Sequence, residues 1–332
     1  PTIQKKLRLL RRFDGKPWRQ AQPKYADLLR REDLFRPTRA RKGSSDYAAI
    51  VRMNKEVFDS LGLVWVREDS VIQITEAGRA FLRTRVRELP DFVGSQLRRY
   101  MYPNPAVGRT YGEAGVFPYL ALLAVLTHFP DGLPPECYEL FISRIRNDDD
   151  IRWAVDHIRG YLRLPAERRA ALVNRLESMP IVRGGRIVAH GRRTGLLRTI
   201  RLNRSYMLGF LCTPGLAAYD RASLRILPER FAEAQQLVQD HLRDDFYILF
   251  PTAEDWIAFY GEPSCWPTAA EALQYYRSRG DVQQALRLFR EPRARRQLPT
   301  ELRELPEGQF RRLQILERTL EDFLAVSYTH LT

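Results

Sequence analysis

Apolar residues recur at helical spacing along most of this chain, and near residue 64 the spacing changes to strict alternation. The helical pattern over 46–61 predicts a helix that a preceding serine can cap at its N-terminus. Alternation over 64–75, interrupted by a polar turn, predicts a β-hairpin. Helical spacing then returns, and Thr75 can cap this next helix. The residues expected to face the core from the helix before the hairpin are Tyr47, Ile50, Val51, Val57, Phe58 and Leu61.

The same succession of helix, hairpin and closing helix returns once. Helices are predicted over 133–146 and 148–179, and a helix running into a strand over 194–211. Residues 222–238 supply a second strand and a closing helix. In this comparison Leu61-Gly62-Leu63 and Leu208-Gly209-Phe210 take equivalent places. We therefore predict a mainly α protein with small β-hairpins, in which two winged-helix-like DNA-binding subdomains are followed by a helical linker.

The predicted domain boundaries follow from these patterns. The first subdomain is expected over residues 1–130, the second over 131–245 and the helical linker over 246–325. The last seven residues, 326–332, leave the charged helical pattern and resemble the translation of an adapter used in sequencing libraries. We expect them to be foreign to the natural gene, which would continue beyond Ala325. The longest apolar run has fourteen residues and predicts a buried helix, because a membrane span needs about 20.

The charge of the chain is unevenly distributed. The net charge is +14, and residues 1–55 hold sixteen lysines and arginines against five acids. The window 178–219 holds seven arginines and no carboxylate. A composition biased by a GC-rich genome would explain 48 arginines against 6 lysines, but it does not explain this clustering. Two unmatched basic blocks indicate an external polyanion, and we expect double-stranded DNA.

The candidate DNA contacts lie in the two basic blocks. Paired hydrogen bonds let arginine recognise guanine and asparagine recognise adenine, whereas lysine favours phosphate. For any one of these residues the alternative is an ordinary solvated position on a helix. In the first block the candidates are Lys5, Lys6, Arg11, Arg12, Arg39, Arg41, Lys42, Arg52, Asn54 and Lys55. In the second block they are Arg192, Arg193, Arg198, Arg201, Asn203 and Arg204.

A catalytic centre is not predicted in this chain. The acid-x-Lys pattern of Mg²⁺-dependent nucleases occurs only at Asp14-Gly15-Lys16, where a turn is the better interpretation. The histidines lack metal-ligand spacing, and Asp148-Asp149-Asp150 is typical of a helix N-terminus. No nucleotide-binding glycine motif is present, so no cofactor is expected in these residues. Three widely separated cysteines and the absence of a signal peptide indicate a cytoplasmic protein that does not contact a membrane.

Four segments, in order along residues 7–267, resemble the AlwI family of type II restriction endonucleases, which includes nicking enzymes. Each segment is weakly specific alone, and the four together are fairly specific. They are LRRFDGKPWRQ with Phe13, Gly15 and Trp18, IQITEAGRAFL, QLRRYMYPNP with Tyr100, Tyr102 and Pro103, and FYGEPSCWP with Tyr260, Gly261 and Pro263.

The resemblance implies a type IIS enzyme whose N-terminal part recognises a short asymmetric site. A C-terminal PD-(D/E)xK domain, which this chain lacks, would hydrolyse the phosphodiester with Mg²⁺. A cognate methyltransferase would accompany it, and the enzyme would act as a monomer, with or without a separate cleavage subunit. The chain as given would bind DNA without cutting it, and no catalytic residue is assigned. The alternatives are a stand-alone winged-helix transcriptional regulator and a protein-interaction module built on the last eighty residues.

Overall fold

The computed structural model describes residues 2–34, 44–66, 70–101, 115–178, 181–183, 186–189, 204, 207–220, 222–244, 247–248, 253–262 and 289–290. Within these residues the protein is mainly helical with small two-stranded antiparallel sheets, which confirms the prediction of a mainly α protein with small β-hairpins. The chain divides into two compact units. Unit 1 comprises the described residues up to Tyr100 together with 253–262, and unit 2 comprises the rest.

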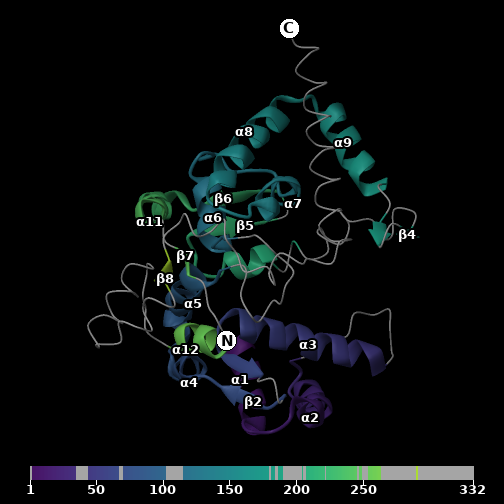
Figure 1. Ribbon diagram of the computed structural model, residues 1–332, viewed down its shortest axis with the longest axis vertical. Coiled ribbons are helices and arrows are strands. Elements are labelled where there is room, and N and C mark those ends of the chain that lie inside the picture. The colour runs from purple at the N-terminus through teal and green to yellow at the C-terminus, as the bar shows by residue number, and fades with distance from the viewer. Residues whose placement is uncertain are drawn as a thin grey trace. The chain divides into compact units, whose positions relative to one another are not determined.

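Unit 1 opens with helices, continues into a β-hairpin and closes with further helices (Figure 1). Its helices are α1 (Thr2–Leu10), α2 (Trp18–Arg31), α3 (Ser44–Ser60), α4 (Glu76–Arg83), α5 (Leu89–Arg99) and α12 (Ala253–Tyr260). Short 3-10 turns lie at Arg11–Phe13 and Val86–Glu88. Its strands are β1 (Val64–Val66) and β2 (Ile72–Ile74), which pair antiparallel with Trp65 opposite Gln73.

The sequence prediction for the hairpin and the helix after it is confirmed. β1 and β2 fall within the alternating stretch, and β2 buries Ile72 and Ile74 while Gln73 is exposed. The hydroxyl of Thr75 accepts a hydrogen bond from the Gly78 amide at 3.0 Å, and α4 begins one residue after Thr75. This side chain therefore satisfies one of the amides that a helix N-terminus leaves without an intrahelical partner.

A short segment after α1 extends the hairpin. The Gly15 amide donates to the Ile72 carbonyl at 2.8 Å, and the Ile72 amide donates to the Lys16 carbonyl at 3.0 Å. The Trp18 amide donates to the Ser70 carbonyl at 2.7 Å, and a carboxylate oxygen of Asp14 accepts from the Ile74 amide at 2.9 Å. Residues 15–18 thus lie along β2 on the side opposite β1, so that β2 has backbone partners on both edges.

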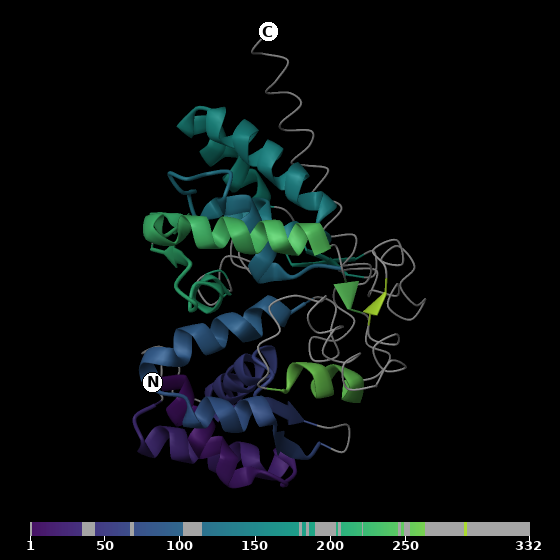
Figure 2. The ribbon, with the colours of Figure 1, turned by 90° about the vertical axis from the view of Figure 1, so that its left-hand side faces the viewer.

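Helix α12 completes the core of unit 1, although it comes from far along the chain. Its Trp256, Phe259 and Tyr260 are each at most 1% exposed, and the Tyr260 hydroxyl donates to the Ser60 carbonyl at 2.5 Å. Figure 2 shows α12, in green, beside the blue elements of unit 1. α12 falls within the predicted linker over 246–325, but it packs in unit 1, where its large aromatic side chains gain more by burial than in an exposed connector.

Two buried polar side chains of α5, Gln96 and Arg99, hold α12 in place. Gln96 donates to the Leu61 carbonyl at 2.7 Å and to the Tyr260 carbonyl at 3.1 Å. Arg99 donates to the carbonyls of Phe259 and Glu262, each at 2.9 Å, and its guanidinium lies 5.5 Å from the centroid of the Phe259 ring. The last carbonyls of α12 lack intrahelical partners, so Arg99 supplies the hydrogen bonds that burial would otherwise leave unmade.

Unit 2 combines helices with several short strands (Figure 1). Its helices are α6 (Pro118–Leu126), α7 (Glu136–Leu140), α8 (Asp149–Arg163), α9 (Ala166–Ser178) and α11 (Phe231–Asp244), with 3-10 turns at Ile142–Arg144 and Pro228–Arg230. Its strand pairs are β3 (Ile181–Arg183) with β4 (Arg186–Ala189), β5 (Ala217–Tyr219) with β6 (Leu224–Ile226), and β7 (Tyr247–Ile248) with β8 (Phe289–Arg290).

Helix α6 is the centre of unit 2. Each residue from Tyr119 to Leu126 is at most 3% exposed, which confirms the buried helix predicted from the long apolar run. α6 packs against α8, α11 and β6. The sequence places the first boundary at residue 130, whereas the compact units divide after Tyr100 and α6 belongs to unit 2. A helix that is apolar on every side must be enclosed by partners, and all of these come from later residues.

The first strand of the second hairpin lies later than the sequence comparison places it. Residues 207–211, which include Gly209, are helical, and β5 begins only at Ala217. The residue equivalent to Gly62 is Gly215. Both have positive φ, +63° and +78°, and both lie two residues before a hairpin begins. Only glycine adopts this backbone region without strain, so the turn geometry and not the apolar neighbours identifies the equivalent position.

A second equivalence appears after the first helix of each unit. Asp14-Gly15-Lys16-Pro17 in unit 1 matches Asp131-Gly132-Leu133-Pro134 in unit 2. Gly15 and Gly132 both have positive φ, and Leu133 exchanges two backbone hydrogen bonds with Leu224 of β6 at 2.8 and 2.9 Å. In both units the residues after this turn therefore pair with the second strand of the hairpin. Comparison of the apolar residues does not identify this motif, because it is only four residues long.

In the part of the chain that the structure describes, no helix has the length and apolar character needed to cross a membrane.

Candidate nucleic-acid interface

The first basic block presents most of its described candidates to solvent. Lys5 on α1 and both Arg11 and Arg12 in the following 3-10 turn are exposed. Opposite them on the same segment, Leu7 and Leu10 are fully buried. The apolar face of α1 therefore fixes the helix on unit 1 and leaves its cations outward, where an anion can reach them.

Lys6 and Asn54 contact each other instead of facing outward. The Lys6 ammonium donates to the Asn54 side-chain carbonyl at 3.0 Å, and burial lowers the pKa of Lys6. Asn54 is only 8% exposed, so its predicted outward orientation is wrong. The physical reason is helical spacing, because Val51, Asn54, Phe58 and Leu61 follow one another by three, four and three residues and form the stripe that α3 buries. Asn54 is a core position occupied by an amide.

The remaining candidates on α3 differ from each other. Arg52 is exposed, as a residue that contacts DNA must be. Lys55 is half-buried and forms an ion pair with the buried Asp59, one turn along the helix. Arg52 is accordingly the candidate on this helix that is exposed, whereas Lys55 would have to leave Asp59 before it could meet a phosphate.

Asp59 gives unit 1 a pH dependence. Burial raises the pKa of its carboxyl to about 6, with the Lys55 ammonium opposing the rise. A raised pKa means that the folded protein holds this proton more tightly than the unfolded chain. Asp59 therefore contributes nothing unfavourable below about pH 4 and lowers stability as the pH rises toward 6 and above.

We expect Asp59→Asn to remove this pH dependence. The stability of the wild type relative to Asp59→Asn should fall by about 3 kcal/mol at most between pH 4 and 7, since each pKa unit corresponds to about 1.4 kcal/mol. Urea unfolding of both proteins across this pH range measures the difference. The control is Asp27→Asn, because Asp27 is 57% exposed and its ion pair with Arg30 is screened by solvent. A constant difference between wild type and Asp59→Asn would contradict the assignment.

Several candidates lie outside the described residues. They are Arg39, Arg41, Lys42, Arg192, Arg193, Arg198, Arg201 and Asn203. Their assignment as DNA contacts stays a prediction from the sequence.

Arg204, the last candidate, is engaged within unit 2. Its guanidinium forms an ion pair with the carboxylate of Glu139 in α7, whose side chain is fully buried, and Arg204 itself is 21% exposed. A carboxylate that is buried in the folded protein needs a charged partner to remain ionised. The prediction that Arg204 projects toward DNA therefore does not fit its surroundings, and its contact with Glu139 fixes one end of the second basic block to the core.

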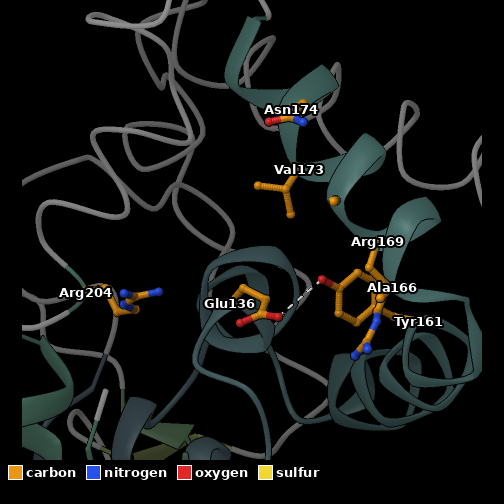
Figure 3. Close-up of a pocket in the computed structure, with 8 residues that line it drawn as sticks. Glu136, Tyr161, Ala166, Arg169, Val173, Asn174 and Arg204 are labelled. Carbon is orange, nitrogen blue, oxygen red and sulfur yellow. Dashed lines mark hydrogen bonds between the residues drawn. The ribbon is translucent and has the colours of Figure 1, made fainter. Parts of the chain in front are cut away.

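A pocket of about 560 Å³ opens near this pair (Figure 3). The Tyr161 hydroxyl points at Glu136 and donates to it at 3.5 Å, and the Arg169 guanidinium lies 5.9 Å from the centroid of the Tyr161 ring. Burial, aided by the nearby Glu136 carboxylate, raises the pKa of Tyr161, so this hydroxyl acts as a donor. The charged groups that line the pocket are the Glu136 carboxylate and the guanidiniums of Arg169 and Arg204, and Arg204 is already paired with Glu139. This mixture of charges favours neither an anionic nor a cationic ligand.

The groups considered for catalysis have structural positions. The Asp14 carboxylate accepts a hydrogen bond from the Ile74 amide. Asp149 and Asp150 lie in the first turn of α8, as the sequence predicts. Burial raises the pKa of the Cys137 thiol, which removes its nucleophilic form. Among the described residues no three His, Cys, Asp or Glu side chains come together as metal ligands.

Comparison with known proteins gives no relative: no protein-family model matches the chain, and no curated protein matches it.

Proposed function

We propose that this chain recognises double-stranded DNA through two winged-helix-like units, as the recognition part of a type IIS restriction or nicking endonuclease. The observation that carries the proposal is the topology that the two units share. In each, a strand segment after an Asp-Gly-x-Pro turn pairs with the second strand of a hairpin, helices lie between them and a helix closes the unit. Helices followed by a hairpin wing are the arrangement in which one helix enters the major groove.

The four segments behind the family resemblance contribute residues to unit 1 as far as the structure describes them, up to Tyr100 in the third and Glu262 in the fourth. The segment of Gly15 pairs with that of Ile72, and the Ala77 amide donates to the Gly261 carbonyl at 2.6 Å. Gln96 and its neighbours hold the segment of Tyr260. Residues spread over most of the chain thus form one core, which is what a shared recognition domain would require of them. This supports the AlwI-like proposal, in which hydrolysis with Mg²⁺ belongs to a separate nuclease domain.

Charge and exposure support DNA as the partner. Lys5, Arg11, Arg12 and Arg52 are exposed on unit 1, and duplex DNA binds such cations by releasing its own counterions. Two non-identical units in one chain suit an asymmetric site, whereas a dimeric regulator would recognise a palindrome.

We expect a binding selection from a randomised duplex pool to enrich one short asymmetric motif. Selection with Arg52→Ala should relax one position of that motif, because a lost base contact costs about 1–3 kcal/mol. Arg31→Ala, which removes an exposed arginine from the end of α2, is the matched control and should return the wild-type motif.

The selection separates the alternatives. A palindromic motif would favour the transcriptional regulator, and a pool with no enriched motif would overturn sequence-specific recognition. Titration of the selected duplex against salt should show a steep loss of affinity, since several phosphates are neutralised.

A further inference from the structure

A buried glutamine of unit 1 brings together two basic segments that are distant in the sequence. The side-chain amide of Gln4, on α1, donates to the Phe81 carbonyl at 2.8 Å and to the Thr84 carbonyl at 2.9 Å. Gln4 is 8% exposed, so this contact is part of the core. It fixes the N-terminal half of α1 against the C-terminal end of α4.

Four exposed cations flank this contact, and we call them the α1–α4 ledge: Lys5, Arg8, Arg83 and Arg85. Lys5 follows Gln4 directly and Arg8 lies one turn beyond it, while Arg83 and Arg85 lie on either side of Thr84. Among the described residues none of the four has a carboxylate partner, whereas the neighbouring Arg87 pairs with Glu88 at 3.4 Å. Holding like charges on one edge costs stability unless an anion lies outside.

The end of the ledge has a second feature. Val86, between Arg85 and Arg87, is 57% exposed and is one of two exposed large apolar side chains among the described residues. Cations that alternate with an exposed apolar group match a sugar–phosphate backbone, where anionic oxygens alternate with deoxyribose carbons. A free phosphate ion would leave Val86 without a partner.

From this geometry we infer that the α1–α4 ledge, formed by residues of α1 and of the C-terminal end of α4, is a DNA-backbone contact. The inference rests on the proposed function and adds to it Arg83 and Arg85, which lie outside both basic blocks. The ledge neutralises phosphates and therefore contributes to affinity on every duplex, while the choice of sequence belongs to other residues.

The test uses a double variant that carries both Arg83→Gln and Arg85→Gln. It is compared with a control double variant of the same net charge. The control is Arg30→Gln with Arg230→Gln, because both arginines are exposed and already pair with acids, Asp27 and Glu233. Affinity is measured for the selected duplex and for a duplex of unrelated sequence over a range of salt. Thermal unfolding confirms that each variant is folded.

We expect the ledge variant to lower the slope of log affinity against log salt by about 1.8, since each lost phosphate contact contributes about 0.9. The affinities for the two duplexes should fall by equal factors, and the control should keep the wild-type slope. A ledge variant equal to the control overturns the inference while duplex binding by the wild type upholds the proposed function. Loss confined to the selected duplex overturns it as well, because that result indicates base recognition. Absence of duplex binding by the wild type overturns both.

Discussion

Replacing Gly62 by alanine is expected to lower the free energy of unfolding of unit 1 by about 2–5 kcal/mol. Two costs add at this position. The backbone has φ of +63°, where a β-carbon costs about 1–2 kcal/mol. The new β-carbon would also lie 2.4 Å from the Tyr260 carbonyl oxygen and 2.8 Å from its ring, so α12 must shift. Overpacking of this kind costs about 1–3 kcal/mol.

Gly215→Ala separates these two costs. Gly215 holds the equivalent turn of unit 2 with φ of +78°, and a β-carbon there would meet nothing within 4 Å. Its substitution should cost about 1–2 kcal/mol, from the backbone alone. Urea unfolding measures both variants, and hydrogen exchange of α12 shows whether that helix has loosened in Gly62→Ala. Equal costs for the two glycines would mean that α12 does not pack against the Gly62 turn.

Local structure in unit 1 was predictable because its signals are local. Alternation identifies the hairpin, and a threonine three residues before Gly78 identifies the cap of α4. The place of α12 was not predictable in this way. Its aromatic residues pack against Ser60 and Gly62, about two hundred residues earlier, and no short pattern in the sequence encodes a contact over that separation. The sequence shows the motifs at Tyr100 and Tyr260, but it does not show that the two tyrosines lie side by side.

The candidate site was predictable where the position of a side chain follows from helical spacing. Arg52 is exposed on α3 because its neighbours Val51 and Phe58 are buried. The same spacing places Asn54 in the buried stripe, so polarity was the misleading signal and position the reliable one. For Lys6 and Arg204 the sequence holds no corresponding signal. Each is taken up by a residue far away, Asn54 and Glu139 respectively, and pairings of this kind become visible only in three dimensions.

The equivalence of the two units shows how little of a structural repeat the sequence needs to retain. Backbone geometry demands glycine at Gly15, Gly132, Gly62 and Gly215, and all four positions keep it with positive φ. Comparing apolar letters therefore selected Gly209, which is helical, whereas a search for turn glycines before each strand would have selected Gly215.

Arg204→Ala is expected to destabilise unit 2 by about 3–5 kcal/mol. The substitution leaves the carboxylate of Glu139 fully buried without its guanidinium partner. Removing one member of a buried ion pair costs this much because the remaining charge keeps its desolvation penalty and loses the compensating attraction. Urea unfolding, with hydrogen exchange of α7 to locate the change, measures the effect.

Two comparisons separate a structural role for Arg204 from a DNA contact. Arg230→Ala removes an exposed ion pair with Glu233 and should cost less than about 1 kcal/mol. Adding Glu139→Gln to Arg204→Ala should restore a large part of the lost stability, because a neutral amide replaces a buried charge that has lost its guanidinium. A residue whose role is to contact DNA would behave in the opposite way. Its loss would leave unfolding unchanged, Glu139→Gln would rescue nothing, and affinity for the selected duplex would fall in a protein as stable as the wild type.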